Sequence, residues 1–289
     1  MIEASIIIGT YNQKDILKRT LEACFKQTYA ADKYEIILVD SMSTDGTDRM
    51  VEDLKPTCRL DYIRQENQGK VNARNRAIRE ARGEFILLTD GDIIPEMDWV
   101  EQHVTTQRKF KDTALAGQTI RLRSEHVTDT ELPTRFKPLQ KISWSYFLTG
   151  SLSIRKELII KAGLFDENFK EYGWEDIELG YRLHKMGVTL RFLPTALNHH
   201  IHPVSKENFV NIMFKMGKSA RIFYKKHPNL QIKLFLGLNP IALGVHWVIH
   251  HNHWLLKYIE KQAPKSKFWQ HILEQYFYLS GATETLNSA

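Results

Sequence analysis

Residues 84–92 read Glu-Phe-Ile-Leu-Leu-Thr-Asp-Gly-Asp, an apolar run followed by two acids that one glycine separates. A run of this composition is typical of a strand buried in a sheet. Two carboxylates at the end of such a strand supply the hard oxygen ligands that Mg²⁺ and Mn²⁺ prefer. Because Asp-Gly is also common in tight turns, Asp90-Gly91-Asp92 alone leaves a structural and a metal-binding interpretation open.

Three similar apolar runs precede this one and alternate with helical patterns. We expect strands at 5–9, 35–39, 60–63 and 84–89, and helices at 14–27, 47–54 and 71–81. The order βαβαβαβ predicts an α/β fold of parallel strands with right-handed crossovers. In such sheets ligands bind beyond the carboxyl ends of the strands, where 10–12, 40–45 and 90–92 supply polar side chains.

Composition and charge narrow the classes of protein that the chain can represent. Of its 289 residues, 43% are hydrophobic and 26% are charged, which is ordinary for a globular protein. The formal net charge of +6 admits nucleic acid, an anionic membrane or a phosphorylated ligand as partner. No G-x-G-x-x-G motif follows the first strand and no Walker lysine loop occurs, so neither a dinucleotide site nor a P-loop is expected.

Three features predict a cytoplasmic location. Cys24 and Cys58 lack the spacing of a disulfide framework or a metal site. The N-terminus lacks the basic and apolar regions of a secretion signal. The longest uncharged stretch, 234–252, contains Pro240 and three histidines and suits a bilayer span of about 20 apolar residues poorly. Peripheral contact with the inner face of the plasma membrane stays open.

The second half of the chain continues the alternation of elements. We expect helices at 98–111, 156–162 and 176–186, and strands at 115–122, 151–154 and 189–192. Residues 123–143 are predicted to form a mobile connection. The expected organisation is a nucleotide-binding half at 1–113, a second half of the same domain at 114–203, and a helical basic region at 204–289.

Short motifs occur in a characteristic order along the first two thirds of the chain. They are Thr10-Tyr11-Asn12, Val39-Asp40, Ser43-Thr44-Asp45-Gly46-Thr47, Asn67-Gln68-Gly69, Ala73-Arg74-Asn75, Asp90-Gly91-Asp92, Gly150-Ser151-Leu152-Ser153-Ile154-Arg155, Gly163-Leu164-Phe165-Asp166 and Gly173-Trp174-Glu175-Asp176. Over roughly residues 4–203 this order resembles the family 2 glycosyltransferases, with a donor-binding half followed by an acceptor-binding half. Gly9 and Met42 depart from the family pattern, which would alter loop shape and not chemistry.

The resemblance implies a fold and an activity. The fold would be the Rossmann-like nucleotide-diphospho-sugar transferase (A-type glycosyltransferase) fold with a mainly helical C-terminal appendage. The enzyme would be an inverting, hexosyltransferase-type enzyme of polysaccharide biosynthesis, dependent on Mn²⁺ or Mg²⁺. It would transfer a sugar from a nucleotide-sugar donor, UDP-sugar favoured, to a hydroxyl of a saccharide or lipid-linked saccharide acceptor. Nucleic acid is not an expected partner.

The resemblance also implies roles at the donor site. The implied donor-binding residues are Thr10, Tyr11, Asn12, Asp40, Asn67, Gly69, Arg74, Asp90 and Gly91. Asp40 would accept an N–H of the base, and Arg74 would meet the diphosphate, for which a guanidinium is well shaped. Taken alone, Arg74 is more typical of a solvated charge on a helix face than of a diphosphate contact. Asp92 would be the principal metal ligand, whereas Asp90 would contact the ribose or a metal-bound water.

Glu175 and Asp176 form a second acidic pair, at an expected helix start where negative charge is favoured. Capping accounts for one of the two acids. The resemblance implies that Asp176 is the general base that takes the proton of the acceptor hydroxyl, while Glu175 orients the acceptor. Trp174 would stack on the acceptor sugar, and Gly150 would line the same subsite.

Three histidines cluster at 199–202, just after the last expected strand. The resemblance implies that one of them completes the metal site, with His200 favoured and His202 second. Hydrogen-bonded loop histidines are the structural alternative for each, His199 included.

Residues 206–233 carry seven Lys or Arg and one acid, with apolar residues at helical spacing. Lys218, Arg221 and Lys225 gather on one side of this expected amphipathic helix. Two hypotheses follow: docking on an anionic membrane surface, or a helix packed on the catalytic domain with a solvated basic face.

Two other functions compete with glycosyl transfer. A sugar-nucleotide nucleotidyltransferase also uses metal-binding acids on a parallel sheet, but it has no role for Glu175 and Asp176. A non-catalytic module that binds sugar nucleotides or glycans would be expected to lack one of the two acidic motifs, yet both are present.

Overall fold

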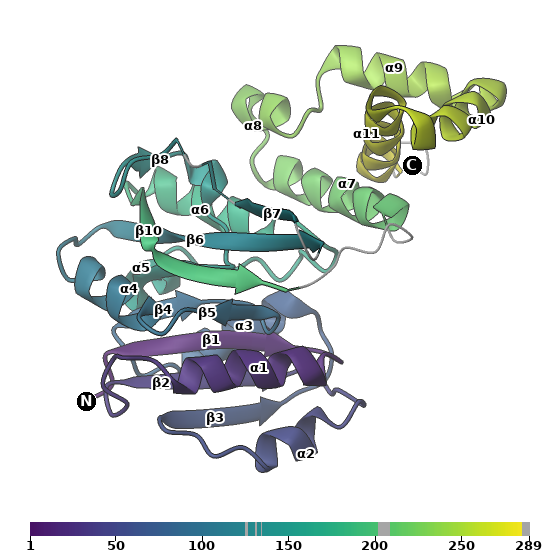
Figure 1. Cartoon of the computed structure of the whole chain (residues 1–289). Coiled ribbons are helices and arrows are strands. Elements are labelled where there is room, and N and C mark those ends of the chain that lie inside the picture. The colour runs from purple at the N-terminus through teal and green to yellow at the C-terminus, as the bar shows by residue number, and fades with distance from the viewer. Residues whose placement is uncertain (125–126, 131, 134, 202–208, 285–289) are drawn as a thin grey trace. The chain divides into compact units, whose positions relative to one another are not determined.

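A computed structural model of the chain describes residues 1–124, 127–130, 132–133, 135–201 and 209–284. The chain divides into two compact units (Figure 1). The first comprises Met1–Glu167 and Asp176–Val204, and the second comprises Asn168–Glu175 and Ser205–Ala289.

The N-terminal part of the first unit contains four parallel strands joined by helices. These are β1 (Ala4–Thr10), α1 (Lys14–Phe25), β2 (Tyr34–Asp40), α2 (Thr47–Glu52), β3 (Arg59–Arg64), α3 (Lys70–Glu80) and β4 (Phe85–Leu88). The strands lie in the order β3-β2-β1-β4, and Thr10 is level with Asp40 at their carboxyl ends. The predicted parallel βαβ pattern is confirmed, with ends that differ from the expected ones by a residue or two.

The remaining strands extend this sheet and mix its directions. They and their helices are β5 (Ile93–Pro95), α4 (Trp99–Gln107), β6 (Thr113–Ser124), β7 (Val127–Thr130), β8 (Lys141–Ile142), η1 (Trp144–Tyr146), β9 (Leu152–Arg155), α5 (Lys156–Lys161), α6 (Glu175–Lys185) and β10 (Thr189–His200). Within the described residues, ten strands form one sheet whose main path is β3-β2-β1-β4-β9-β6-β10-β5. β9 is antiparallel to both β4 and β6, and β5 is antiparallel to β10.

Two predictions for this region are wrong. The described part of 123–143 is not a mobile connection, because β7 pairs with β6 and β8 pairs with β10. The last strand does not end at Phe192 but continues to His200. Its register against β6 shifts between Leu193 and Leu197, where Pro194 has no N–H to donate to the ladder. His199 and His200 therefore lie inside a strand and not after it.

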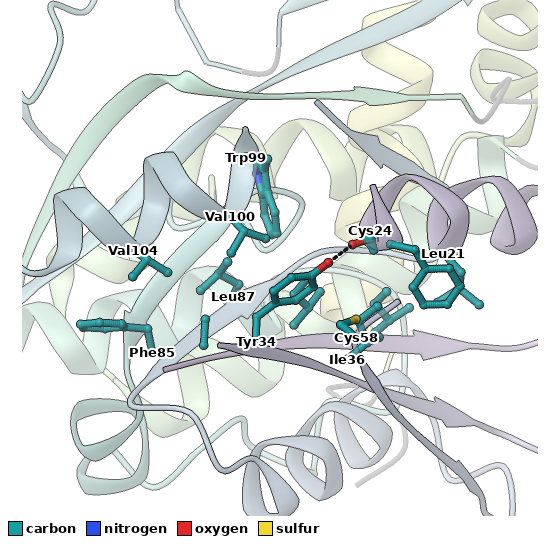
Figure 2. Packing of buried hydrophobic residues seen from close by; sticks show 14 of the residues in the cluster. Leu21, Cys24, Tyr34, Ile36, Cys58, Phe85, Leu87, Trp99, Val100 and Val104 are labelled. Atoms are coloured by element: carbon teal, nitrogen blue, oxygen red, sulfur yellow. Dashed lines mark hydrogen bonds between the residues drawn. The ribbon is translucent and has the colours of Figure 1, made fainter. Parts of the chain in front are cut away.

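The core on one face of the sheet lies between α1, α4 and the central strands (Figure 2). Trp99 and Val100 of α4 are completely buried there. The Tyr34 hydroxyl donates to the Cys24 carbonyl oxygen over 2.8 Å, which joins β2 to α1. Cys24 and Cys58 are buried free thiols, and burial raises the pKa of both, that of Cys58 to about 11. Thiols in such surroundings serve packing.

The second unit is helical. Its elements are α7 (Phe209–Lys226), α8 (Leu230–Phe235), α9 (Pro240–His250), α10 (His253–Gln262), η3 (Ala263–Lys265) and α11 (Lys267–Thr283). The predicted amphipathic helix is confirmed as α7, and its apolar residues Ala220 and Phe223 are buried. No helix in the part of the chain that the structure describes is long and apolar enough to cross a bilayer.

α7 and α11 approach each other closely through two glycines. A Cβ atom at Gly217 would overlap the carbonyl oxygen of Tyr278, and one at Gly281 would overlap that of Phe214. Both obstacles are backbone atoms of a facing helix, which cannot move aside as a flexible side chain could. The packing of this unit therefore requires glycine at both positions.

We expect Gly217→Ala to lower the free energy of unfolding by about 1–3 kcal/mol, because overpacking outweighs the gain in helix propensity. Gly244→Ala on α9 is the matched control, since a Cβ there meets nothing within 4 Å. It should stabilise the helix by up to about 1 kcal/mol. Urea unfolding measures both, and a loss of stability in the control as large as that in Gly217→Ala would contradict the close-packing account.

Candidate active site

The loop after β2 is tied to the end of β1 by side-chain hydrogen bonds. The Asn12 amide N–H donates to Ser43 Oγ over 2.9 Å, and Asn12 Oδ1 accepts from the Thr44 N–H over 2.8 Å. Asn12 has φ near +50°, a conformation in which asparagine is favoured among non-glycine residues. These bonds fix the rim of the predicted nucleoside pocket.

Asp40, predicted to contact the base, is fully buried. Its Oδ1 accepts from the Ser43 N–H and hydroxyl over 2.9 and 2.5 Å, and its Oδ2 accepts from the Tyr62 hydroxyl over 2.7 Å. The carboxylate thus organises the loop in this structure. Thr10, which is level with Asp40, is buried, and its Oγ1 has no hydrogen-bond partner among the described residues. Tyr11, the next residue in the chain, is exposed.

Asp90 is held between two cations of α3. Lys70 Nζ lies 3.0 Å from its Oδ2, and a terminal nitrogen of Arg74 lies 2.6 Å from its Oδ1. The Arg74 side chain is only 1% exposed, and its guanidinium lies 5.6 Å from the centre of the Phe165 ring. Burial disfavours the charged form of Asp90, but Lys70 and Arg74 outweigh it and hold the pKa well below the usual range. Asp90 therefore stays ionised.

Asp92 meets His200. The His200 Nε2 atom lies 3.2 Å from Asp92 Oδ2, although 108 positions separate the two residues in the chain. Antiparallel pairing places His200 level with Ile93, and the Ile201 N–H donates to the Asp92 carbonyl oxygen over 3.1 Å. The hydrogen bond with Asp92 raises the pKa of His200.

The other two histidines of the cluster differ from His200. His199, its neighbour on β10, lies with its Nε2 atom 2.8 Å from Glu96 Oε1. His202 lies outside the described residues.

Among the described residues, the Asp92 carboxylate and the His200 imidazole lie close enough together to hold a divalent cation between them. No group of three or more His, Cys, Asp or Glu suited to a metal is present across the ranges that the structure describes. An aspartate oxygen and a neutral imidazole nitrogen both suit Mn²⁺, and a site with two protein ligands leaves positions for phosphate oxygens of a substrate. The Asp92 and His200 pair fits a cation shared with a diphosphate.

The acidic pair of the acceptor motif lies at the start of α6. Asp176 Oδ1 accepts from the Ile177 N–H over 2.8 Å, while Glu175 is buried. Trp174 has φ near +70° and lies in the second unit, where its ring centre is 5.6 Å from that of Phe235. In this structure the ring of Trp174, predicted to stack on the acceptor, thus packs against an aromatic residue of the chain.

Asn67 and the three glycines predicted for the site take part in hydrogen bonds that involve the glycine backbone. Asn67 Oδ1 accepts from the Gly69 N–H over 3.1 Å, and Gly69 has φ near +93° just before α3. The Gly91 carbonyl oxygen accepts from the Thr20 hydroxyl over 3.0 Å. The Gly150 carbonyl oxygen accepts from the Asn198 side-chain amide over 2.8 Å.

A family model described as Glycosyl transferase family 2 matches residues 5–165, which is more than half of the chain. The chain belongs to glycosyltransferase family 2. The predicted membership is confirmed.

Curated relatives of this family 2 chain are similar over most of its length. An uncharacterized glycosyltransferase, YfnE of Bacillus subtilis, is 27% identical over 258 residues, which cover 70% of this chain and 66% of YfnE. A chondroitin synthase of Escherichia coli is 26% identical over 263 residues, which cover 78% of this chain and 38% of the synthase. The chain thus spans only part of the length of these relatives.

Solved structures share the fold. The mannosyltransferase PcManGT from Pyrobaculum calidifontis, in complex with GDP-Man and Mn²⁺, matches with a TM-score of 0.68 at 20% identity over 98% of this chain and 87% of that one. S. aureus TarS 1–349 in complex with UDP matches with a TM-score of 0.61 at 18% identity over 99% of this chain and 92% of that one. The A-type glycosyltransferase fold with a helical C-terminal part is confirmed.

Lys70 lies at the candidate site, beside Asp90, and sequence patterns did not indicate it for this family 2 chain. It directly follows Asn67-Gln68-Gly69, and the turn at Gly69 with φ near +93° places it in the first turn of α3. In a sequence, a lysine at the start of a helix cannot be distinguished from an ordinary surface lysine. Its position directly after a motif expected to bind the donor was the available signal.

Glu178 and Arg182 of α6 fix the turn of the Gly163-Leu164-Phe165-Asp166 motif. The Arg182 Nε atom lies 2.9 and 3.0 Å from the two oxygens of Glu178, which is fully buried. A terminal nitrogen of Arg182 also donates to the Leu164 carbonyl oxygen over 2.6 Å. Part of the family motif is therefore structural.

Arg182→Ala should cost about 3 kcal/mol of stability or more, because it leaves the buried Glu178 carboxylate without its cation. Arg79→Ala is the control, since Arg79 and Glu167 form an ion pair 3.4 Å apart with both side chains about half exposed. That change should cost less than about 1 kcal/mol. Urea unfolding of the two variants tests this, and equal losses would refute the buried-pair account.

Proposed function

We propose that the chain transfers a sugar from a nucleotide-sugar donor to a hydroxyl of a saccharide or lipid-linked saccharide acceptor, with inversion and with Mn²⁺ or Mg²⁺. The observation that carries the proposal is the approach of Asp92 to His200 at 3.2 Å beside a charged Asp90. Family membership supplies the reaction class. Among related folds, PcManGT in complex with GDP-Man and Mn²⁺ supports a nucleotide sugar and a divalent cation as ligands.

Asp92 and His200 would hold the cation together with oxygens of the donor diphosphate. The cation supplies positive charge that stabilises the departing nucleoside diphosphate. His200 must be neutral to serve as a ligand, so binding of the cation would displace the proton that Asp92 favours on the imidazole. Lys70, which is exposed for nearly half of its side chain, would add a second positive charge near the diphosphate.

Asp90 would contact the ribose or a cation-bound water, since its charge is fixed by Arg74 and Lys70. Arg74 is buried against Asp90, so we assign it the role of holding that carboxylate in place beside the diphosphate. Thr10, Tyr11, Asn12 and Asp40 would form the nucleoside pocket, and the buried, unpartnered hydroxyl of Thr10 leaves a hydrogen bond for the ligand.

A UDP-sugar is the favoured donor. TarS in complex with UDP supports that choice, whereas PcManGT in complex with GDP-Man makes a guanine donor the alternative to test.

Asp176 would act as the general base and Glu175 would orient the acceptor. Asp176 lies in the first turn of α6, where the N–H groups of a helix interact favourably with negative charge. It would take the proton of the acceptor hydroxyl as that oxygen attacks the anomeric carbon from the face opposite the leaving diphosphate. Trp174 and Gly150 are the other two residues to which we assign acceptor binding.

Asp92→Ala should lower turnover by at least about 10³-fold, because metal stabilisation of the leaving group supplies several kcal/mol. His200→Ala should raise the Mn²⁺ concentration needed for half-maximal turnover. His199→Ala is the control, since neighbouring strand residues point to opposite faces and His199 faces Glu96.

The measurement is nucleoside diphosphate release from a panel of donors, with EDTA and then Mn²⁺ added. Full turnover of Asp92→Ala, or activity that survives EDTA, would refute the metal assignment. Release of pyrophosphate in place of nucleoside diphosphate would indicate a nucleotidyltransferase. Donor binding without any product release would indicate a binding module.

Asp176→Asn should lower kcat by about 10²–10⁴-fold, which is the usual contribution of a general base, and leave donor binding unchanged. Glu157→Gln is the control, because Glu157 is likewise an acid in the first turn of a helix, α5. Single-turnover kinetics together with donor titration separate the two effects. Equal kcat values for Asp176→Asn and the control would remove Asp176 from the mechanism.

A further inference from the structure

The outward face of α9 is apolar. Ile241, Val245 and Val248 follow one another at helical spacing and are exposed, Ile241 for 81% of its surface. Trp247 beside them is 61% exposed. α9 contains no Asp, Glu, Lys or Arg, and its buried side includes His246. Its other buried residue is Ile249, so α9 is apolar on both its buried and its exposed side, whereas surface helices normally turn polar residues outward.

Neighbouring helices of the same unit continue this pattern. On α10, Trp254 is 71% exposed and Tyr258, one turn later, is also exposed. Exposed large apolar residues also occur on α8 and at the start of α11: Leu230, Leu234 and Phe268. Single exposed apolar residues are normal, but a concentration in one small unit marks a binding surface.

The region that contains these exposed apolar residues is positively charged. Residues 205–289 contain eleven Lys or Arg and four Glu, whereas the whole chain has a net charge of +6. The C-terminal region therefore carries all of the excess positive charge. Lys257 and Lys261 lie on α10, one turn apart, and both are exposed. Exposed Trp and Tyr combined with Lys are the composition of segments that lie in the headgroup region of a membrane.

We propose that the outward side of α9 and α10 binds an anionic membrane surface. Ile241, Val245, Val248, Trp247 and Trp254 enter the headgroup and upper acyl region, while Lys257 and Lys261 contact lipid phosphates. A second copy of the chain is the other occupant that would cover an apolar face. The net positive charge of this region repels an identical surface and attracts anionic lipid, which decides in favour of the membrane. The inference stands independently of the proposed glycosyl transfer.

The test is flotation of the whole chain with vesicles of phosphatidylcholine, with and without phosphatidylglycerol. We expect binding to the anionic vesicles at low salt and release at about 1 M salt, where the Debye length is about 3 Å. The triple variant Ile241→Ser, Val245→Ser and Val248→Ser should lower the partition coefficient at least about tenfold, because it removes apolar surface that the membrane buries. Lys257→Glu with Lys261→Glu should lower it by about tenfold or more.

Matched controls come from the first unit. Met97→Ser with Ile160→Ser changes exposed apolar residues there, and Lys109→Glu with Lys111→Glu changes exposed lysines. Neither pair should alter apolar insertion, and the lysine pair should lower binding by less than Lys257→Glu with Lys261→Glu. Wild-type protein that stays with the unbound fraction at low salt would overturn the proposal. A dimer in solution that dissociates in the α9 triple variant would also overturn it, because that result would assign the face to a second copy of the chain.

Tryptophan fluorescence gives a second readout. Brominated acyl chains quench indoles that enter the membrane, so wild-type protein should lose fluorescence on anionic vesicles. Trp247→Phe with Trp254→Phe keeps the surface apolar, and this variant should still float but lose most of the quenching. Undiminished quenching in that variant would show that other tryptophans touch the membrane and would overturn the assignment to α9 and α10.

Discussion

The antiparallel pairing of β10 with β5 is the constraint on which the candidate metal site depends. It places His200 level with Ile93 and joins Ile201 to the backbone of Asp92, so two short segments far apart in sequence present an imidazole and a carboxylate to each other. Strand alternation makes this arrangement sensitive to register, since a slip of one residue would turn His199 toward Asp92. The shift in register of β10 against β6, between Leu193 and Leu197, helps to determine which histidine of β10 lies beside Asp92.

The charge of Asp90, the carboxylate next to the candidate metal site, is compensated by two cations. Asp90 and Asp92 are separated by one residue, yet their surroundings differ: the first is paired with Lys70 and Arg74, and the second with the titratable His200. Two adjacent anions would otherwise repel each other and raise each other's pKa. Because Lys70 and Arg74 of α3 neutralise the charge of Asp90, we assign the binding of the cation to Asp92. There the cation would replace the proton that the Asp92–His200 pair shares.

The sequence predicted most of what depends on local pattern. The four parallel strands, their helices and the family followed from apolar periodicity and motif order, and the structure and the comparisons agree. It did not predict β5, the length of β10 or the strands within 123–143, because three-residue strands and a strand that contains Pro194 have no clear periodicity. Lys70 and the Glu178–Arg182 pair were likewise missed, since their roles arise from partners that only the fold brings near.

The chain passes between the compact units at more than one point, and one of these boundaries falls between Glu175 and Asp176. The residues before it, including Trp174, pack with helices of the C-terminal region through Phe235 and Tyr278. An engineered chimera that took only residues 205–289 from a relative would therefore leave Trp174 facing foreign side chains. An exchange of the helical region between enzymes of this kind must therefore include the short segment 168–175. That segment and residues 205–289 form one transferable module.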